Sequence, residues 1–334
     1  MEVLLDFGAR FVHQLQSPTL AFLLGGILIA AVGSRLTIPD AIYKFIVFML
    51  LLKVGLKGGM AIGEADISAM LLPALIAVLV GFLIVIIGRY TLAMLPGIRT
   101  EDGIATAGLF GAVSGSTLAA GTVVLEADGI PYEPWAVALY PFMDIPALVL
   151  AIVLASVYLK KKDGTDTKVA IWPIVKESLQ GPALSALLLG IALGLFTNPE
   201  KVFDSFYEPL FRGLLSVLML IMGIEAYARL SELRRVAHWF AIYAAVMPLV
   251  HGLITFGLGV IAHHLVGFSP GGVVLLAIIA GSSSDISGPP TLRAGIPTAN
   301  PSAYIGSSTS IGTPVAIAIG IPLYIGLAQI VFAT

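Results

Sequence analysis

Long apolar segments separated by short polar connections run through almost the whole chain. A helix that crosses a lipid bilayer needs about 20 mostly apolar residues. Lipid cannot pair backbone polar groups, so only helices and closed barrels span a membrane. Ten such segments are found, near residues 18–34, 40–57, 68–95, 103–125, 134–159, 178–197, 209–229, 236–265, 270–290 and 303–332. The sequence therefore predicts an all-α membrane protein of ten transmembrane helices, in contact with lipid.

The overall composition excludes several classes of soluble protein. Hydrophobic residues make up 58% of the 334 positions and charged residues 11%, against about 45–50% and 25% in average soluble proteins. A net charge of −2 without a basic tract argues against a nucleic-acid partner. The lack of cysteine excludes disulfides and thiolate metal sites. The first residues do not have the pattern of a secretory signal peptide.

The distribution of basic residues predicts the orientation in the membrane. Cytoplasmic connections carry an excess of lysine and arginine. If the N-terminus lies outside, most of the 18 basic residues fall at cytoplasmic ends of spans, including Lys160, Lys161 and Lys162. Acidic residues such as Glu126 and Glu208 then fall at exterior ends. We therefore expect both termini outside.

The chain resembles itself at a shift of about 164–168 residues. The sequence LQSPTL at 15–20 corresponds to LQGPAL at 179–184, and each opens a span. This divides the chain into a first five-helix repeat (1–159), a short cytoplasmic linker (160–170) and a second repeat (171–334). Because five is odd, the second repeat must insert upside down. Inverted repeats with interrupted helices in matching positions are typical of secondary transporters.

Spans four and nine contain glycine- and serine-rich runs at corresponding positions, Gly111–Thr117 and Gly281–Pro290. Taken alone, the first run is equally well explained by close helix packing. As a pair they favour two broken helices that meet near the bilayer midplane. Half-helix N-termini there would present free N–H groups and positive dipole ends to a small anion.

Two acidic residues lie deep within predicted spans. Asp285, in the second run, has no lysine, arginine or histidine at its predicted depth, and a charge in this position indicates a functional site. A sodium ion bound by the carboxylate, by hydroxyls such as that of Ser283 and by unwound carbonyls would balance it. Asp144 either pins a proline-kinked helix by a hydrogen bond or contributes to ion coupling; both interpretations stay open.

An intramembrane protease is the main alternative to a transporter. A serine protease would need a serine nucleophile beside a histidine, but the Gly-x-Ser-x-Gly motif is missing. Asp144 and Asp285 could form an aspartic pair, yet their flanking residues differ from those of such enzymes. Neither class predicts two matching breaks. We therefore expect no enzyme activity.

Five segments resemble the cyanobacterial sodium-dependent bicarbonate transporters of the SbtA type. The resemblance runs nearly end to end. These segments are QLQSPTLAFL (14–23), GLFGAVSGST (108–117), LYPFMDIPAL (139–148), SSSDISGPPTLRAGIP (282–297) and NPSAYIGSST (300–309).

The resemblance implies sodium-coupled bicarbonate uptake across the plasma (inner) membrane, as part of a carbon-concentrating mechanism. It also implies a homotrimer whose protomers contain a gate part (spans 1–2 and 6–7) and a core part (spans 3–5 and 8–10). A PII-like trimeric regulatory protein would bind the cytoplasmic face. The linker is short, which puts any regulation residing in it in question. The residues alone leave sulfate and small carboxylates as equally admissible anions.

Carried over onto this sequence, the resemblance and the two breaks predict two adjoining sets of site residues. The expected substrate-binding residues are Ser114, Gly115, Ser116, Thr117, Ser284, Ile286 and Ser287. The expected sodium ligands are Asp285, Ser283 and Asp144.

Overall fold

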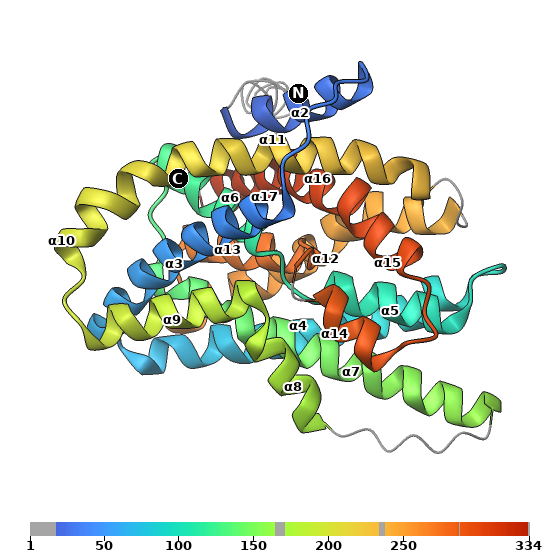
Figure 1. Cartoon of the computed structure of the whole chain (residues 1–334). Helices are drawn as coiled ribbons and strands as arrows, with labels where there is room; N and C mark the ends of the chain where they lie inside the picture. Colours follow the sequence, from blue (N-terminus) through green and yellow to red (C-terminus); the bar gives the residue numbers. More distant parts are fainter. Residues whose placement is uncertain (1–17, 164–170, 234–237, 287, 333–334) are drawn as a thin grey trace.

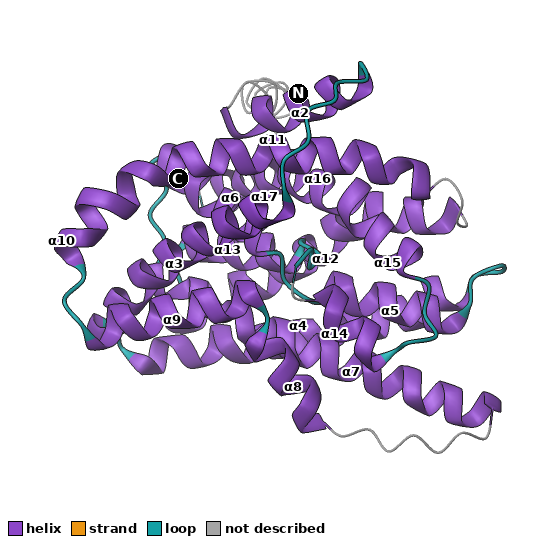
Figure 2. Cartoon of the chain, in the orientation of Figure 1, coloured by secondary structure: helices purple, strands orange, loops and turns teal. Residues whose placement is uncertain are grey.

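The computed structural model describes residues 18–163, 171–233, 238–286 and 288–332, and all regular structure among them is helical (Figures 1 and 2). The helices of the first half are α2 (Pro18–Ala31), α3 (Asp40–Glu64), α4 (Ile67–Tyr90), η1 (Leu92–Met94), α5 (Thr100–Gly111), α6 (Gly115–Ala127), η2 (Pro134–Ala138) and α7 (Leu139–Asp163). Those of the second half are α8 (Ile171–Gln180), α9 (Pro182–Phe196), α10 (Glu200–Val202), η3 (Phe203–Tyr207), α11 (Glu208–Leu233), α12 (His238–Val266), α13 (Pro270–Ala280), α14 (Gly288–Gly295), α15 (Pro301–Ser307), η4 (Ser308–Gly312), α16 (Thr313–Val315), η5 (Ala316–Gly320) and α17 (Ile321–Val331).

Seven helical segments of the described chain are long and apolar enough to cross a membrane, and the bent pair α8–α9 raises this to eight. Two of the ten expected spans, near 18–34 and 270–290, contain shorter apolar helices instead, over Ala21–Ala31 and Pro270–Ala280. The prediction of an all-α protein with several membrane-spanning helices is confirmed. The count of ten stays a prediction.

The outer faces of the long helices carry large apolar side chains. On α4, Leu71, Leu75 and Leu79 follow one another at intervals of four residues, which places them on one helix face, and each is more than half exposed. Apolar stripes of this length on the surface of a soluble protein would drive association. On a membrane protein they form the surface that faces lipid.

Two helix pairs pack so closely that their backbones touch. Gly26 of α2 meets Gly223 of α11, and Gly55 of α3 meets Gly190 of α9. A Cβ atom added to Gly190 would lie 2.5 Å from the carbonyl oxygen of Leu52. Small residues permit this approach between helices in membranes. The glycines therefore fix α2 against α11 and α3 against α9.

The remaining long helices form a second set of contacts. Helices α4, α5 and α7 pack against one another, and α12 packs along α13. The segment formed by α5 and α6 is fully buried over its most apolar stretch, so it lies in the interior of the helix bundle.

Both expected helix breaks are present in this buried region. Helix α5 ends at Gly111 and α6 begins at Gly115, with extended backbone at Ala112. Helix α13 ends at Ala280 and α14 begins at Gly288.

Candidate functional site

The two breaks are hydrogen-bonded directly to each other. The backbone N–H of Ser114 donates to Ser282 Oγ at 3.0 Å. In return, the backbone N–H of Ser284 donates to the carbonyl oxygen of Leu109 at 2.9 Å. Non-helical backbone is tolerated at membrane depth only where the protein itself or enclosed water pairs it. The reciprocal contacts meet this requirement and hold the two broken helices together.

Asp144 and Tyr140 of α7 pair the backbone of Val113, which lies between the extended residues Ala112 and Ser114. The N–H of Val113 donates to Asp144 Oδ1 at 2.9 Å, and its carbonyl oxygen accepts from Tyr140 Oη at 3.0 Å. The side chain of Asp144 is completely buried. Its second oxygen, Oδ2, has no hydrogen-bond partner among the described residues. This geometry gives Asp144 a positional contact with the first break.

Asp285 of the second break accepts hydrogen bonds from three hydroxyl groups. Ser116 Oγ donates to Oδ2 at 2.7 Å, Tyr43 Oη donates to the same oxygen at 3.2 Å, and Ser114 Oγ lies 3.3 Å from Oδ1. The two serine hydroxyls are 2.8 Å apart. An ionised carboxylate away from bulk water needs such donors or a cation. Asp285 is therefore the charged centre of a polar cluster built from both breaks and from α3.

The N-terminus of α6 points into this cluster. Ser114 is its N-cap, and Ser114 Oγ accepts from the N–H of Thr117 at 3.1 Å. Gly115, in the first turn, lies against Leu51 of α3, where a Cβ atom would approach the leucine side chain to 2.7 Å. The positive end of a helix dipole stabilises negative charge. The α6 N-terminus therefore favours the Asp285 carboxylate and any further anion nearby.

The last long helical segment contributes more hydroxyls on the other side of the second break. Ser283 Oγ and Ser308 Oγ are 2.7 Å apart, and Ser284 Oγ accepts from the N–H of Gly288 at 2.9 Å. Ser308 opens η4, a π-helical turn. Such turns occur frequently at functional sites.

A cavity of about 140 Å³ leads to Asp285. It is lined by α3 and α11 on one side and by the second break with α15 and η4 on the other: Asp40, Tyr43, Lys44, Met222, Glu225, Arg229, Asp285, Ile286, Ile305 and Thr309. Asp40 and Lys44 form an ion pair and their side chains are more than half exposed, so the cavity reaches the surface at the N-terminal end of α3.

The structure brings together only part of the predicted site. Ser114, Ser116 and Asp285 share one hydrogen-bonded cluster, and Ile286 lines the cavity. Gly115 and Thr117 lie in the first turn of α6. The hydroxyl of Ser283 bonds to Ser308, that of Ser284 accepts from the N–H of Gly288, and Asp144 contacts Val113. Ser287 lies outside the described residues.

Sequence reasoning did not identify Tyr43 and Glu225 as site residues. Tyr43 donates to Asp285, and Glu225 of α11 lines the cavity. Glu225 could have been noticed as an acid within the apolar run 209–229. Tyr43 carried no such signal, because tyrosines at span ends are common as interfacial anchors.

The oxygen atoms of this site fit a hard cation better than a transition metal. Among the described residues, no group of three or more histidine, aspartate or glutamate side chains is arranged to hold a metal ion. Hydroxyl, carboxylate and carbonyl oxygens are the ligands that hard cations prefer. Hydroxyl and carboxylate oxygens meet at Asp285.

A sequence model of the Na⁺-dependent bicarbonate transporter superfamily matches residues 18–329. The match covers most of the chain, including both breaks. No match is found among curated proteins.

Proposed function

The chain belongs to the Na⁺-dependent bicarbonate transporter superfamily, and we propose that it is a symporter that carries bicarbonate into the cell together with sodium. The observation that supports this most directly is the placement of Asp285. Its carboxylate lies where two broken helices meet, and it is paired by neutral hydroxyls. A half-buried charge at the end of a cavity within a membrane is costly, and a sodium ion would balance it.

In the proposed mechanism, sodium binds Asp285 and reorders the hydroxyls around it. Each hydroxyl has one hydrogen to donate and two lone pairs, so Ser114 and Ser116 can turn from donors into ion ligands. Sodium then cancels the negative charge that would repel bicarbonate from the α6 N-terminus. Each ligand thereby lowers the cost of binding the other, which is positive coupling. The inward sodium gradient drives bicarbonate accumulation.

We extend the proposal to an inverted repeat. The contacts between glycines support it, because a shift of 164 residues relates Gly26 to Gly190 and a shift of 168 relates Gly55 to Gly223. The Gly26–Gly223 contact thus has a counterpart in the Gly55–Gly190 contact. A pseudo-two-fold axis would generate this pairing. This pairing of helices agrees with a gate part made of α2, α3, α9 and α11.

Several further features rest on the sequence alone. The homotrimer, the PII-like regulatory partner on the cytoplasmic face and the inner-membrane location rest on its resemblance to the family. The orientation with both termini outside rests on the distribution of basic residues, and the division at 160–170 rests on the internal repeat. Sulfate or a small carboxylate is the alternative substrate, since the hydroxyls and the helix N-terminus would also accept these anions.

The test is uptake of labelled bicarbonate into proteoliposomes at alkaline pH, with and without an inward sodium gradient. We expect accumulation only with sodium. Asp285→Ala should abolish the sodium dependence, whereas Asp66→Asn, which changes an exposed carboxylate between α3 and α4 but keeps a good N-cap, should behave as the parent.

Two results would contradict the proposal. Sodium-driven uptake that persists in Asp285→Ala would remove this residue from the ion site. Uptake of labelled sulfate or acetate in place of bicarbonate would leave the coupling mechanism but change the substrate.

A further inference from the structure

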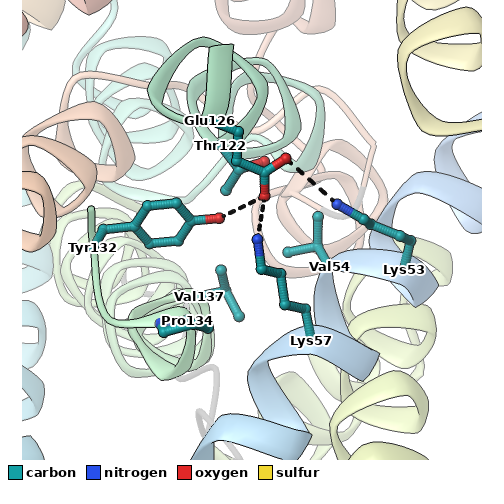
Figure 3. Close-up of a pocket in the computed structure, with 8 residues that line it drawn as sticks. All are labelled: Lys53, Val54, Lys57, Thr122, Glu126, Tyr132, Pro134 and Val137. Carbon is teal, nitrogen blue, oxygen red and sulfur yellow. Dashed lines mark hydrogen bonds and ion pairs between the residues drawn. The ribbon is translucent and has the colours of Figure 1, made fainter. Parts of the chain in front are cut away.

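Four charged side chains form a cluster at the end of α6 opposite to Asp285. Figure 3 shows three of them, Lys53, Lys57 and Glu126, and the fourth is Glu208. Lys57 Nζ of α3 lies 2.5 Å from Glu126 Oε1 in the last turn of α6, and Lys53 Nζ lies 3.6 Å from Glu126 Oε2. Lys53 also lies 3.0 Å from Glu208 Oε2 at the start of α11. The cluster therefore joins two helices of the proposed gate part to one helix of the proposed core part.

Neighbouring aromatic groups complete the pairing of these charges. Tyr132 Oη donates to Glu126 Oε1 at 3.1 Å. Burial, and then the negative charge of Glu126, raise the pKa of Tyr132 well above its ordinary value, so its hydroxyl stays a donor. Lys53 is 1% exposed, and its ammonium lies 3.9 Å from the centre of the Phe211 ring. Both sides of a buried ion pair need such compensation.

The cluster has no room for a ligand. The space between its side chains is too small for a water molecule, and two lysines are matched by two glutamates. A substrate or ion site would leave a cavity or an uncompensated charge. This arrangement instead holds helices together, and because Lys53 and Glu126 each have two charged partners, one pair can break while the more buried member of that pair keeps another partner.

Helices α3 and α6 are thus connected at two places. At one place Tyr43 of α3 and Ser116 of α6 both donate to Asp285; at the other, Lys53 and Lys57 bind Glu126. Ten residues separate Tyr43 from Lys53, and ten separate Ser116 from Glu126, which is about 15 Å along each helix. The cavity opens at the first place, and the ion pairs close the second.

We propose that Lys53, Lys57, Glu126 and Glu208 form an ion-pair lock that closes the route to Asp285 on the side away from the cavity, and that this lock opens once in every transport cycle. The inference rests on the proposed function, because a lock of this kind is needed only if Asp285 is reached alternately from two sides. In the expected orientation the lock lies on the exterior side.

The experiment measures access to the lock without measuring transport. The chain contains no cysteine, so Thr122→Cys introduces a single thiol. Thr122 lines the pocket one turn before Glu126 and is 1% exposed. Purified protein in right-side-out vesicles is exposed to a membrane-impermeant maleimide from each side in turn. Labelling rates are compared between the Thr122→Cys parent and three variants of it, which add Glu126→Gln, Lys57→Met or Lys201→Met. Lys201→Met is the control, because it changes an exposed lysine outside the lock.

We expect Glu126→Gln and Lys57→Met to speed labelling roughly tenfold from the side on which the lock lies, which is the exterior side in the expected orientation. A roughly tenfold change is a common size for conformational coupling. Lys201→Met should leave the labelling rate unchanged. Equal rates in all variants, with monodisperse protein, would overturn the proposal. Failure of both lock variants to give monodisperse protein would also overturn it, since the cluster would then be needed for folding and could not open. If the lock variants are labelled faster but the parent does not transport bicarbonate, the proposed substrate is contradicted and the lock stays supported.

Discussion

Replacement of Asp144 separates a positional role from a role in ion coupling. Asp144→Asn keeps a carbonyl oxygen that can accept the hydrogen bond from Val113, whereas Asp144→Ala removes the acceptor. The residue is fully buried, so the alanine variant leaves a buried N–H without a partner. Such a group costs about 1–3 kcal/mol, which corresponds to a change of roughly 5- to 140-fold in an equilibrium constant.

We expect Asp144→Ala to melt several degrees below the parent in detergent and to transport poorly, because the first break is no longer held in its extended form. Asp144→Asn should melt close to the parent and keep sodium-dependent uptake, with at most a small loss from placing an amide where Oδ2 has no partner. The assays are thermal unfolding of purified protein and uptake over a series of sodium concentrations.

If Asp144→Asn melts like the parent but loses its sodium dependence, Asp144 has more than a positional role. The carboxylate charge would then be needed for ion binding, and Asp144 would join Asp285 as a sodium ligand.

Three further substitutions test other parts of the structure. Gly26→Ala should destabilise the protein by about 1–3 kcal/mol, since its Cβ would lie 2.2 Å from a backbone oxygen of α11. In the control Gly25→Ala the new Cβ meets nothing within 4 Å, so the substitution should be neutral. The unfolding temperatures of the two variants are compared. Ser282→Ala should lower stability and uptake together, because the N–H of Ser114 loses its partner; normal uptake would show that the breaks need no such link. Tyr43→Phe removes a hydrogen-bond donor that stabilises the Asp285 carboxylate when no sodium is bound. Half-maximal uptake should therefore need roughly tenfold less sodium, as expected for the loss of a hydrogen bond to a charged group. If more sodium is needed instead, the Tyr43 hydroxyl is a sodium ligand.

The positions of the breaks could be predicted from the sequence because their cause is local. Glycine and serine runs destabilise a helix wherever they lie, and Gly111–Thr117 and Gly281–Pro290 do so in the structure. Asp285 was equally visible, since a carboxylate in an apolar run has few structural explanations.

The partners of these residues could not be predicted, because they depend on packing between distant helices. Tyr43 lies 242 positions from Asp285 in the sequence, and nothing in its neighbourhood indicates that the side chain points inward. Asp144 illustrates the same limit, since a hydrogen bond to Val113 and an ion ligand require the same residue type. The contacts between Lys53, Glu126 and Glu208 likewise join three separate helices.

The kinds of contact in the structure indicate where movement during transport would occur. The α3–α9 interface contains glycines whose backbones touch, so sliding there would force main-chain atoms into one another. Between α3 and α6 the main attachments are side-chain hydrogen bonds and ion pairs, at Asp285 and at Glu126. These bonds can break and re-form while each helix keeps its own backbone bonds, because packed elements shift by exchanging side-chain contacts. The boundary between α3 and α6 is therefore the surface along which the breaks can move, and sodium at Asp285 would act directly on it by competing with Tyr43 for the carboxylate.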